Sequence, residues 1–83
     1  MIEELHKKYV QERTPEARDK LIIACLPYVK SSAYRLSIYA NPSQDVNDLI
    51  SAGVIGLMDA LERYDPARGA SFKNYAKYRI RGS

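Results

Sequence analysis

The residues best suited to binding a ligand lie near the C-terminal end of this chain. On a helical wheel of residues 71–81, basic, amide and aromatic side chains share the outward face: Lys73, Asn74, Lys77, Tyr78 and Arg81. The opposite face is expected to enter the core with Phe72, Tyr75, Ala76 and Ile80. Nucleic acid bases stack on tyrosine rings, and lysine or arginine neutralises nearby phosphates. The pattern favours a surface for single-stranded nucleic acid, but a solvated amphipathic helix with extended lysines would look the same.

A second candidate surface lies on residues 45–62, which also show the spacing of an amphipathic helix. One face is expected to enter the core: Val46, Leu49, Ile50, Gly53, Leu57, Ala60 and Leu61. A stripe beside it comprises Asn47, Ser51, Val54, Ile55 and Met58, flanked by Asp48, Asp59 and Glu62. Apolar patches with a polar rim are typical of protein-binding surfaces, and methionine adapts to varied partners. The residues alone leave open a broad apolar face that is buried inside a small bundle.

No set of side chains in the sequence indicates an enzyme. The chain has one histidine, His6, one cysteine, Cys25, and scattered carboxylates, which do not form a nucleophile with a base and an orienting group. Cys25 falls on an apolar helix face and is expected to be a buried hydrophobe, whereas His6, beside two lysines, is expected to be solvent-exposed. Asp45 and Asp48 have a spacing that suits a cation, but capping and partner contacts explain them better. We therefore predict no catalytic residue, no metal, no cofactor and no small-molecule substrate.

Composition points to one small soluble domain with two differently charged segments. The chain has 83 residues, of which 46% are hydrophobic, and a net charge of +3. Residues 42–62 carry four carboxylates and no base, whereas residues 63–83 carry six bases and one carboxylate. This separation suggests two contact surfaces, although solvated helix faces also produce it. No apolar run approaches the roughly 18 residues of a membrane span, and the N-terminus lacks the pattern of a signal peptide, which predicts a cytoplasmic protein without membrane contact.

Helices must position these surfaces, because no segment has the alternation of a strand. Four helices are predicted: residues 2–12, residues 15–38, a third that ends near residue 63, and a last one that runs to residue 81. The expected N-caps of the last three are Thr14, either Ser43 or Asp45, and Ser71. The predicted fold class is a compact all-α bundle of about four helices.

Three residues are unusual for the helices in which they lie. Pro27 lacks an N–H group, so it is expected to kink or divide the second helix after Leu26. Gly53 and Gly56 each cost about 1 kcal/mol relative to alanine in a helix interior. Because neither glycine sits at a helix end, we expect a neighbouring helix to approach the third helix closely at these positions.

Three stretches of the sequence, residues 48–58, 60–69 and 72–82, resemble the second conserved region of bacterial RNA polymerase sigma factors of the sigma-70 family. They follow the family pattern in one register, which implies the fold of sigma factor region 2. The ending Tyr78-Arg79-Ile80-Arg81-Gly82 resembles the flagellar and sporulation (motility-type) branch more than the housekeeping branch. Residues 15–40 resemble the helical segment that precedes this region in the family, with less specific motifs.

The resemblance implies roles for both candidate surfaces. In the family, the helix that matches residues 45–62 docks on a coiled coil of the beta-prime subunit of core RNA polymerase. The matching contacts are Asn47, Asp48, Ser51, Ala52, Val54, Ile55 and Met58. The next segment melts the promoter minus-ten element and captures flipped bases of the non-template strand. The matching positions are Arg68, Phe72, Lys73, Asn74, Tyr75, Tyr78 and Arg79, and the outward-facing Lys77 and Arg81 complete the predicted DNA-binding set. Phe72 and Tyr75 are expected to support this site from the core side.

Two departures limit what the resemblance implies. Housekeeping sigma factors carry paired tryptophans where this chain has Tyr78 and Arg79, so melting is expected to be weaker or restricted to fewer promoters. The sequence also stops at Ser83, within the helix that continues into DNA-reading residues in the family. We therefore expect residues 1–83 to be a fragment of a larger factor that lacks this continuation and the later domains. The alternative is a protein-interaction module that an anti-sigma protein binds, without DNA binding by itself.

Overall fold

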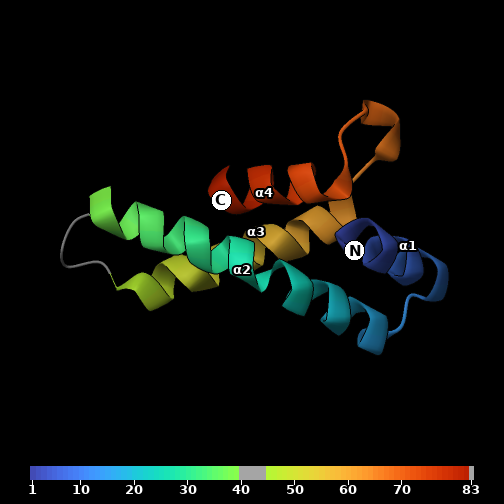
Figure 1. The fold of residues 1–83 in the computed structure, drawn as a ribbon, viewed down its shortest axis with the longest axis horizontal. Coiled ribbons are helices and arrows are strands. Elements are labelled where there is room, and N and C mark those ends of the chain that lie inside the picture. Colours follow the sequence, from blue (N-terminus) through green and yellow to red (C-terminus); the bar gives the residue numbers. More distant parts are fainter. Residues whose placement is uncertain (40–44, 83) are drawn as a thin grey trace.

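The computed structural model describes residues 1–39 and 45–82, and every regular element in this part of the chain is helical. The elements are α1 (Ile2–Glu12), α2 (Pro15–Tyr39), α3 (Val46–Arg63), the short 3-10 helix η1 (Pro66–Arg68) and α4 (Phe72–Gly82). The predicted all-α fold class and its four helices are confirmed. In Figure 1, α2 and α3 run in opposite directions, α4 runs back over α3, and α1 packs beside the start of α4.

The core lies where α2, α3 and α4 meet. Its buried apolar side chains are Leu21, Cys25, Val29, Leu57, Ala60, Leu61, Phe72, Ala76 and Ile80. Cys25 is fully buried, as predicted. Burial, with a smaller contribution from the Glu3 carboxylate, raises the pKa of the Cys25 thiol to about 11. The thiol therefore stays protonated near neutral pH and packs as a small hydrophobe.

The starts of three helices follow the capping signals in the sequence. The Thr14 hydroxyl accepts a hydrogen bond from the backbone N–H of Ala17 at 3.2 Å, and the Ser71 hydroxyl accepts one from Asn74 at 3.2 Å. The Asp45 carboxylate accepts one from the N–H of Asn47 at 2.9 Å. Each bond satisfies an N–H group that has no partner within its own helix. Asp45 is thus the N-cap of α3, and the alternative, Ser43, lies outside the described residues.

Pro27 does not divide α2, which continues without interruption from Pro15 to Tyr39. Of the two predicted effects of Pro27, division of the helix is therefore wrong, and a kink stays a prediction. Pro27 is exposed, on the side of α2 that faces away from the core, while Cys25 and Val29 on either side of it are fully buried. Because both neighbours are anchored in one core, packing outweighs the loss of a single backbone hydrogen bond.

The predicted close approach of a helix to Gly53 is confirmed. A Cβ atom added there would lie 2.9 Å from Cγ1 of Val29 in α2 and 3.5 Å from Cγ2 of Ile80 in α4. The first distance is shorter than carbon atoms tolerate without movement. Gly53 therefore sets how closely α3 packs against α2. Gly56 is also buried.

The first helix, α1, holds the start of α4 by contacts between residues far apart in the sequence. The two carboxylate oxygens of Glu3 accept hydrogen bonds from the backbone N–H groups of Phe72 and Lys73, at 3.1 and 3.0 Å. The His6 ring stacks on Phe72 with 4.3 Å between ring centroids, and it meets Tyr64 edge-on at 5.0 Å. His6 is half-buried, so the prediction of a solvent-exposed histidine is wrong. Its burial arises from packing of α1 on α4, which no local pattern indicates.

We expect the half-buried position of His6 to make stability depend on pH. Burial lowers the pKa of the His6 imidazole below its ordinary value of 6.5; Glu3 opposes this change and Arg13 adds to it. The unfolded chain therefore binds a proton more readily than the folded one. The His6 contribution to the free energy of unfolding should be fully present above pH 6.5 and lost as the pH falls through the lowered pKa.

Urea unfolding at about pH 7.5 and about pH 5 measures this effect. The matched control is His6→Phe, which keeps an aromatic ring on Phe72 but has no group that titrates. The wild type should lose more stability than this variant between the two pH values. Equal losses would show that His6 titration does not contribute.

Candidate functional site

The outer stripe of α3 is exposed at most of the predicted positions. Ile55 and Met58 expose 67% and 47% of their surface, and Asn47, Asp48 and Ser51 are also exposed. These residues form an apolar centre with a polar rim, as the sequence predicted. The stripe can therefore bind a protein surface without rearrangement of the core.

Some α3 residues lie deeper or shallower than the helical wheel predicted. Val54 is half-buried and packs against the core, and Ala52 is half-buried as well. Val46, Leu49 and Ile50, which were predicted to be core residues, are only half-buried. Figure 1 shows the reason, because the start of α3 and the end of α2 project beyond the C-terminal end of α4. Because no third helix among the described residues covers them, the first turns of α3 stay half-buried.

The outward face of α4 also follows the prediction. Lys73, Asn74, Tyr78 and Arg81 are exposed, and Lys77 is half-buried. Tyr78 exposes 68% of its surface, so its ring is open to a stacking partner. Phe72 is fully buried and the half-buried Tyr75 packs against the core, which places both rings behind this face.

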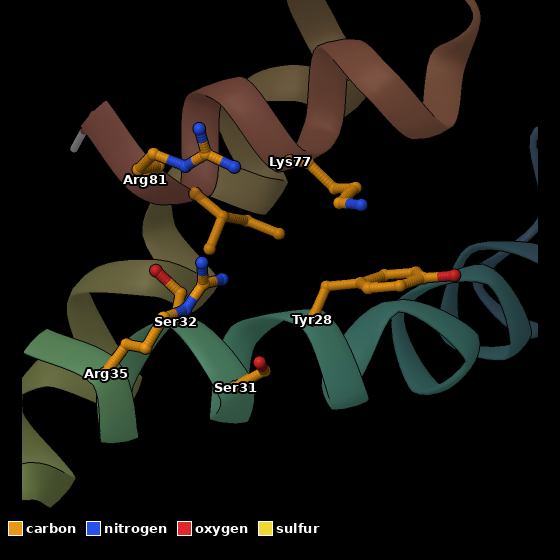
Figure 2. A pocket seen from close by; sticks show the side chains of 7 residues that line it. Tyr28, Ser31, Ser32, Arg35, Lys77 and Arg81 are labelled. Carbon is orange, nitrogen blue, oxygen red and sulfur yellow. The ribbon is translucent and has the colours of Figure 1, made fainter.

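A groove between α2 and α4 adds residues that the sequence reasoning missed. Its volume is about 260 Å³, and its lining residues are Tyr28, Ser31, Ser32 and Arg35 from α2 and Lys77, Ile80 and Arg81 from α4. Figure 2 shows Arg35 extending from α2 into this groove and Lys77 extending from α4 toward the Tyr28 ring. The Nζ atoms of Lys73 and Lys77 lie 5.5 and 5.3 Å from the centre of that ring.

The chemistry of this groove suits a nucleic acid strand. Three cationic side chains and two serines surround a tyrosine ring, a combination that attracts phosphate and offers an aromatic surface. Tyr28, Ser31 and Arg35 recur at helical spacing on one side of residues 15–38. That polar side was the signal in the sequence that would have identified them.

The remaining predicted DNA-binding residues lie elsewhere. Arg68 is exposed in η1 and lines a second groove, of about 430 Å³, together with Tyr75. The Tyr64 hydroxyl donates a 2.7 Å hydrogen bond to the carbonyl of Ala70, which ties the loop around this groove to the end of α3. Arg79 differs from the others, because its guanidinium forms an ion pair with Asp59 of α3. The structure therefore brings Lys77 and Arg81 together in one groove and places Arg68 in another.

Comparison with known families decides what kind of domain carries these surfaces. A sequence model described as Sigma-70 region 2 matches residues 21–83. The chain belongs to this family. The family is not one of enzymes, and it is the sigma factor family that the sequence motifs predicted, with relatives in the flagellar branch.

Several sigma factors are similar to this region 2 domain. RNA polymerase sigma factor FliA from Pseudomonas aeruginosa is 40% identical over 77 residues, which are 93% of this chain and 31% of that protein. RNA polymerase sigma-D factor from Bacillus subtilis is 38% identical over 79 residues, which are 95% of this chain and 31% of that protein. FliA from Escherichia coli is 45% identical over 58 residues, or 70% of this chain and 24% of that protein. The domain thus spans at most about a third of the length of these relatives.

The part of the region 2 domain that the structure describes comprises residues 1–39 and 45–82. No group of three or more histidine, cysteine, aspartate or glutamate side chains there is placed to hold a metal ion. No helix in the same part of the chain is long and apolar enough to cross a membrane.

Proposed function

We propose that this domain binds the beta-prime coiled coil of core RNA polymerase through α3, and that it captures the non-template strand of the promoter minus-ten element through α4 and the groove beside it. The observation that carries the proposal is the placement of two exposed surfaces of different chemistry on adjacent helices. The α3 stripe is apolar with an acidic and polar rim, whereas the α2–α4 groove is cationic and aromatic. One small domain can therefore contact a protein and a nucleic acid strand at the same time.

The exposed apolar side chains of α3 support the docking part of the proposal. Ile55 and Met58 lie one turn apart on the same side of the helix and are open to solvent. Exposed apolar side chains at the centre of a patch gain most when a partner removes them from water. Asn47, Asp48 and Ser51 continue the stripe toward the N-terminus of α3 and provide hydrogen-bonding groups for its rim.

The arrangement of charge around Tyr28 and Tyr78 supports the strand-capture part. Lys77 and Arg81 approach Arg35 across the α2–α4 groove, so the positive potential is concentrated where two helices meet. A single strand that follows this groove brings its phosphates to the cations, while a base stacks on the open ring of Tyr78. Phe72 and Tyr75 support this site from the core side. Phe72 packs in the core and Tyr75 packs against it, which fixes the orientation of α4 and of its outward side chains.

The double substitution Lys77→Ala and Tyr78→Ala tests strand capture. Loss of one stacked base costs about 1–3 kcal/mol, so we expect the affinity for a minus-ten non-template strand to fall about 5- to 150-fold. Loss of one phosphate contact should also reduce the dependence of log affinity on log salt concentration by about 0.7. The measurement is a strand titration with the chain bound to core polymerase, followed by fluorescence.

The matched control is Lys30→Ala with Tyr34→Ala, which removes an exposed lysine and an exposed tyrosine from the outer side of α2. This control should leave strand affinity within about twofold of the wild type, as expected for surface changes away from a binding site. If the Lys77 and Tyr78 double variant also binds the strand like the wild type, the proposed capture site is wrong. The interaction module bound by an anti-sigma protein would then be the better description.

A further inference from the structure

An ion pair joins α3 to α4, and it is the only one between two helices in the described part of the chain. The Asp59 carboxylate lies between two guanidinium groups: it pairs with Arg79 of α4 through Oδ2, and its Oδ1 atom lies 2.8 Å from Nε of Arg63. The Asp59 side chain is 24% exposed and that of Arg79 is 37% exposed, so the pair is partly shielded from water. Partial shielding strengthens the attraction between the two charges.

The direction of Arg79 sets it apart from the cations of the α2–α4 groove. At 100° per residue, Arg79 lies about 160° around the helix from Lys77 and from Arg81. Its Nε atom is buried and has no hydrogen-bond acceptor among residues 1–39 and 45–82. The guanidinium therefore faces α3, where Asp59 is its counter-ion, and not the groove in which Lys77 and Arg81 meet.

We propose that Arg79 and Asp59 form a latch that positions α4 for strand capture, and that Arg79 does not itself contact DNA. This inference rests on the proposed function of α4, and it replaces the contact role that the family resemblance implied for Arg79. An isolated helix of 11 residues is marginal in water, so α4 depends on its contacts with neighbouring helices for its orientation. The latch holds the side of α4 that faces α3, so that Lys77, Tyr78 and Arg81 point toward the strand.

The latch also lies between the two proposed surfaces. Asp59 follows Met58, an exposed residue of the docking stripe, and its carboxylate reaches the helix that carries Tyr78. The ion pair thus connects the helix that docks on protein to the helix that meets the strand.

Three variants test the latch with the chain bound to core polymerase: Arg79→Gln, Asp59→Asn and the double variant. Because each single change breaks the same ion pair, both should lower strand affinity by about the same factor, about fivefold, and the double variant should be no worse than either. The salt dependence of strand binding should stay as in the wild type, since no phosphate contact is lost. Affinity for core polymerase should also stay unchanged, which separates positioning of α4 from general unfolding.

Two control variants make the salt dependence informative. Arg81→Gln, in the groove, should reduce the slope of log affinity against log salt by about 0.7, because it removes a phosphate contact. Arg63→Gln should leave strand binding unchanged, because Arg63 shares the Asp59 carboxylate but lies in α3, and its side chain is 70% exposed. Arg79 would be a strand contact, and the latch wrong, if Arg79→Gln reduced the slope like Arg81→Gln while Asp59→Asn bound as well as the wild type. The latch is equally overturned if neither Arg79→Gln nor Asp59→Asn changes strand affinity.

Hydrogen exchange of the α4 amides tests the latch without DNA. Exchange should be faster in Arg79→Gln and in Asp59→Asn than in the wild type, and unchanged in Arg63→Gln, because only the first two release α4 from α3. If the wild-type chain failed to capture the strand, the proposed function would fail, while this exchange pattern would still support the ion pair as the latch of α4. Identical exchange in all four proteins would overturn the latch itself.

Discussion

Replacing Phe72 by alanine is expected to lower the free energy of unfolding by about 3–5 kcal/mol. The Phe72 side chain is fully buried, stacks on His6 and meets Tyr64 edge-on with 5.4 Å between ring centroids. Removal of the ring leaves a cavity where α1, α3 and α4 meet. Because small domains have a total stability of about 5–15 kcal/mol, a loss of this size removes a large part of it. Urea unfolding followed by circular dichroism measures the change.

Tyr78→Ala is the matched control for Phe72→Ala, because it removes an aromatic ring from the exposed side of the same helix. We expect it to change stability by less than about 0.5 kcal/mol. The comparison also separates two roles that the family resemblance combined. A Phe72→Ala protein that stayed as stable as the wild type but lost strand binding would show that Phe72 contacts DNA directly.

Replacing Ile55 by aspartate is expected to weaken binding to core polymerase by about 30-fold or more, which corresponds to about 2 kcal/mol. Ile55 is the most exposed apolar side chain of the α3 stripe, and a carboxylate at that position would have to lose water without gaining a partner. Met58→Asp should act in the same direction. A titration of labelled core polymerase with each variant measures the affinity.

Ile23→Asp is the matched control for the docking prediction. Ile23 exposes 64% of its surface on the side of α2 that faces away from the core. The substitution Ile23→Asp therefore introduces the same charge as Ile55→Asp, at an isoleucine that is similarly exposed. It should leave affinity for core polymerase unchanged, and none of the three variants should change the urea midpoint by much, because no core residue is altered. Equal weakening by Ile23→Asp and Ile55→Asp would mean that polymerase does not recognise the α3 stripe specifically.

The helices and most of the core face could be predicted from the sequence, because local signals specify them. Thr14, Asp45 and Ser71 cap the helices whose starts they mark, and the 3.6-residue repeat places Leu57, Ala60 and Leu61 in the core. These features depend on residues within one or two turns of each other. The sigma-70 family was likewise predicted from contiguous motifs.

The features that could not be predicted all depend on contacts between helices. The groove around Tyr28 exists because α4 crosses α2, and the Asp59–Arg79 pair depends on how α4 lies on α3. His6 was expected to be exposed because its sequence neighbours are charged, but its burial is decided by Phe72, 66 positions later. A helical wheel contains no information on which helix will cover a given face. Val54 was therefore predicted on the exposed stripe and Leu49 in the core, whereas both are half-buried.

The contacts of α1 also decide at which residue a shortened form of this domain should begin. The family match starts at residue 21, inside α2, and therefore leaves out Glu3 and His6. A protein trimmed to that boundary would lose the carboxylate that accepts from Phe72 and Lys73, and it would uncover one face of a core phenylalanine. The family match therefore begins at a residue that is not the start of the packed domain, because α1 also contacts α4. The contacts that hold the start of α4 in place extend to Glu3, in the first turn of α1.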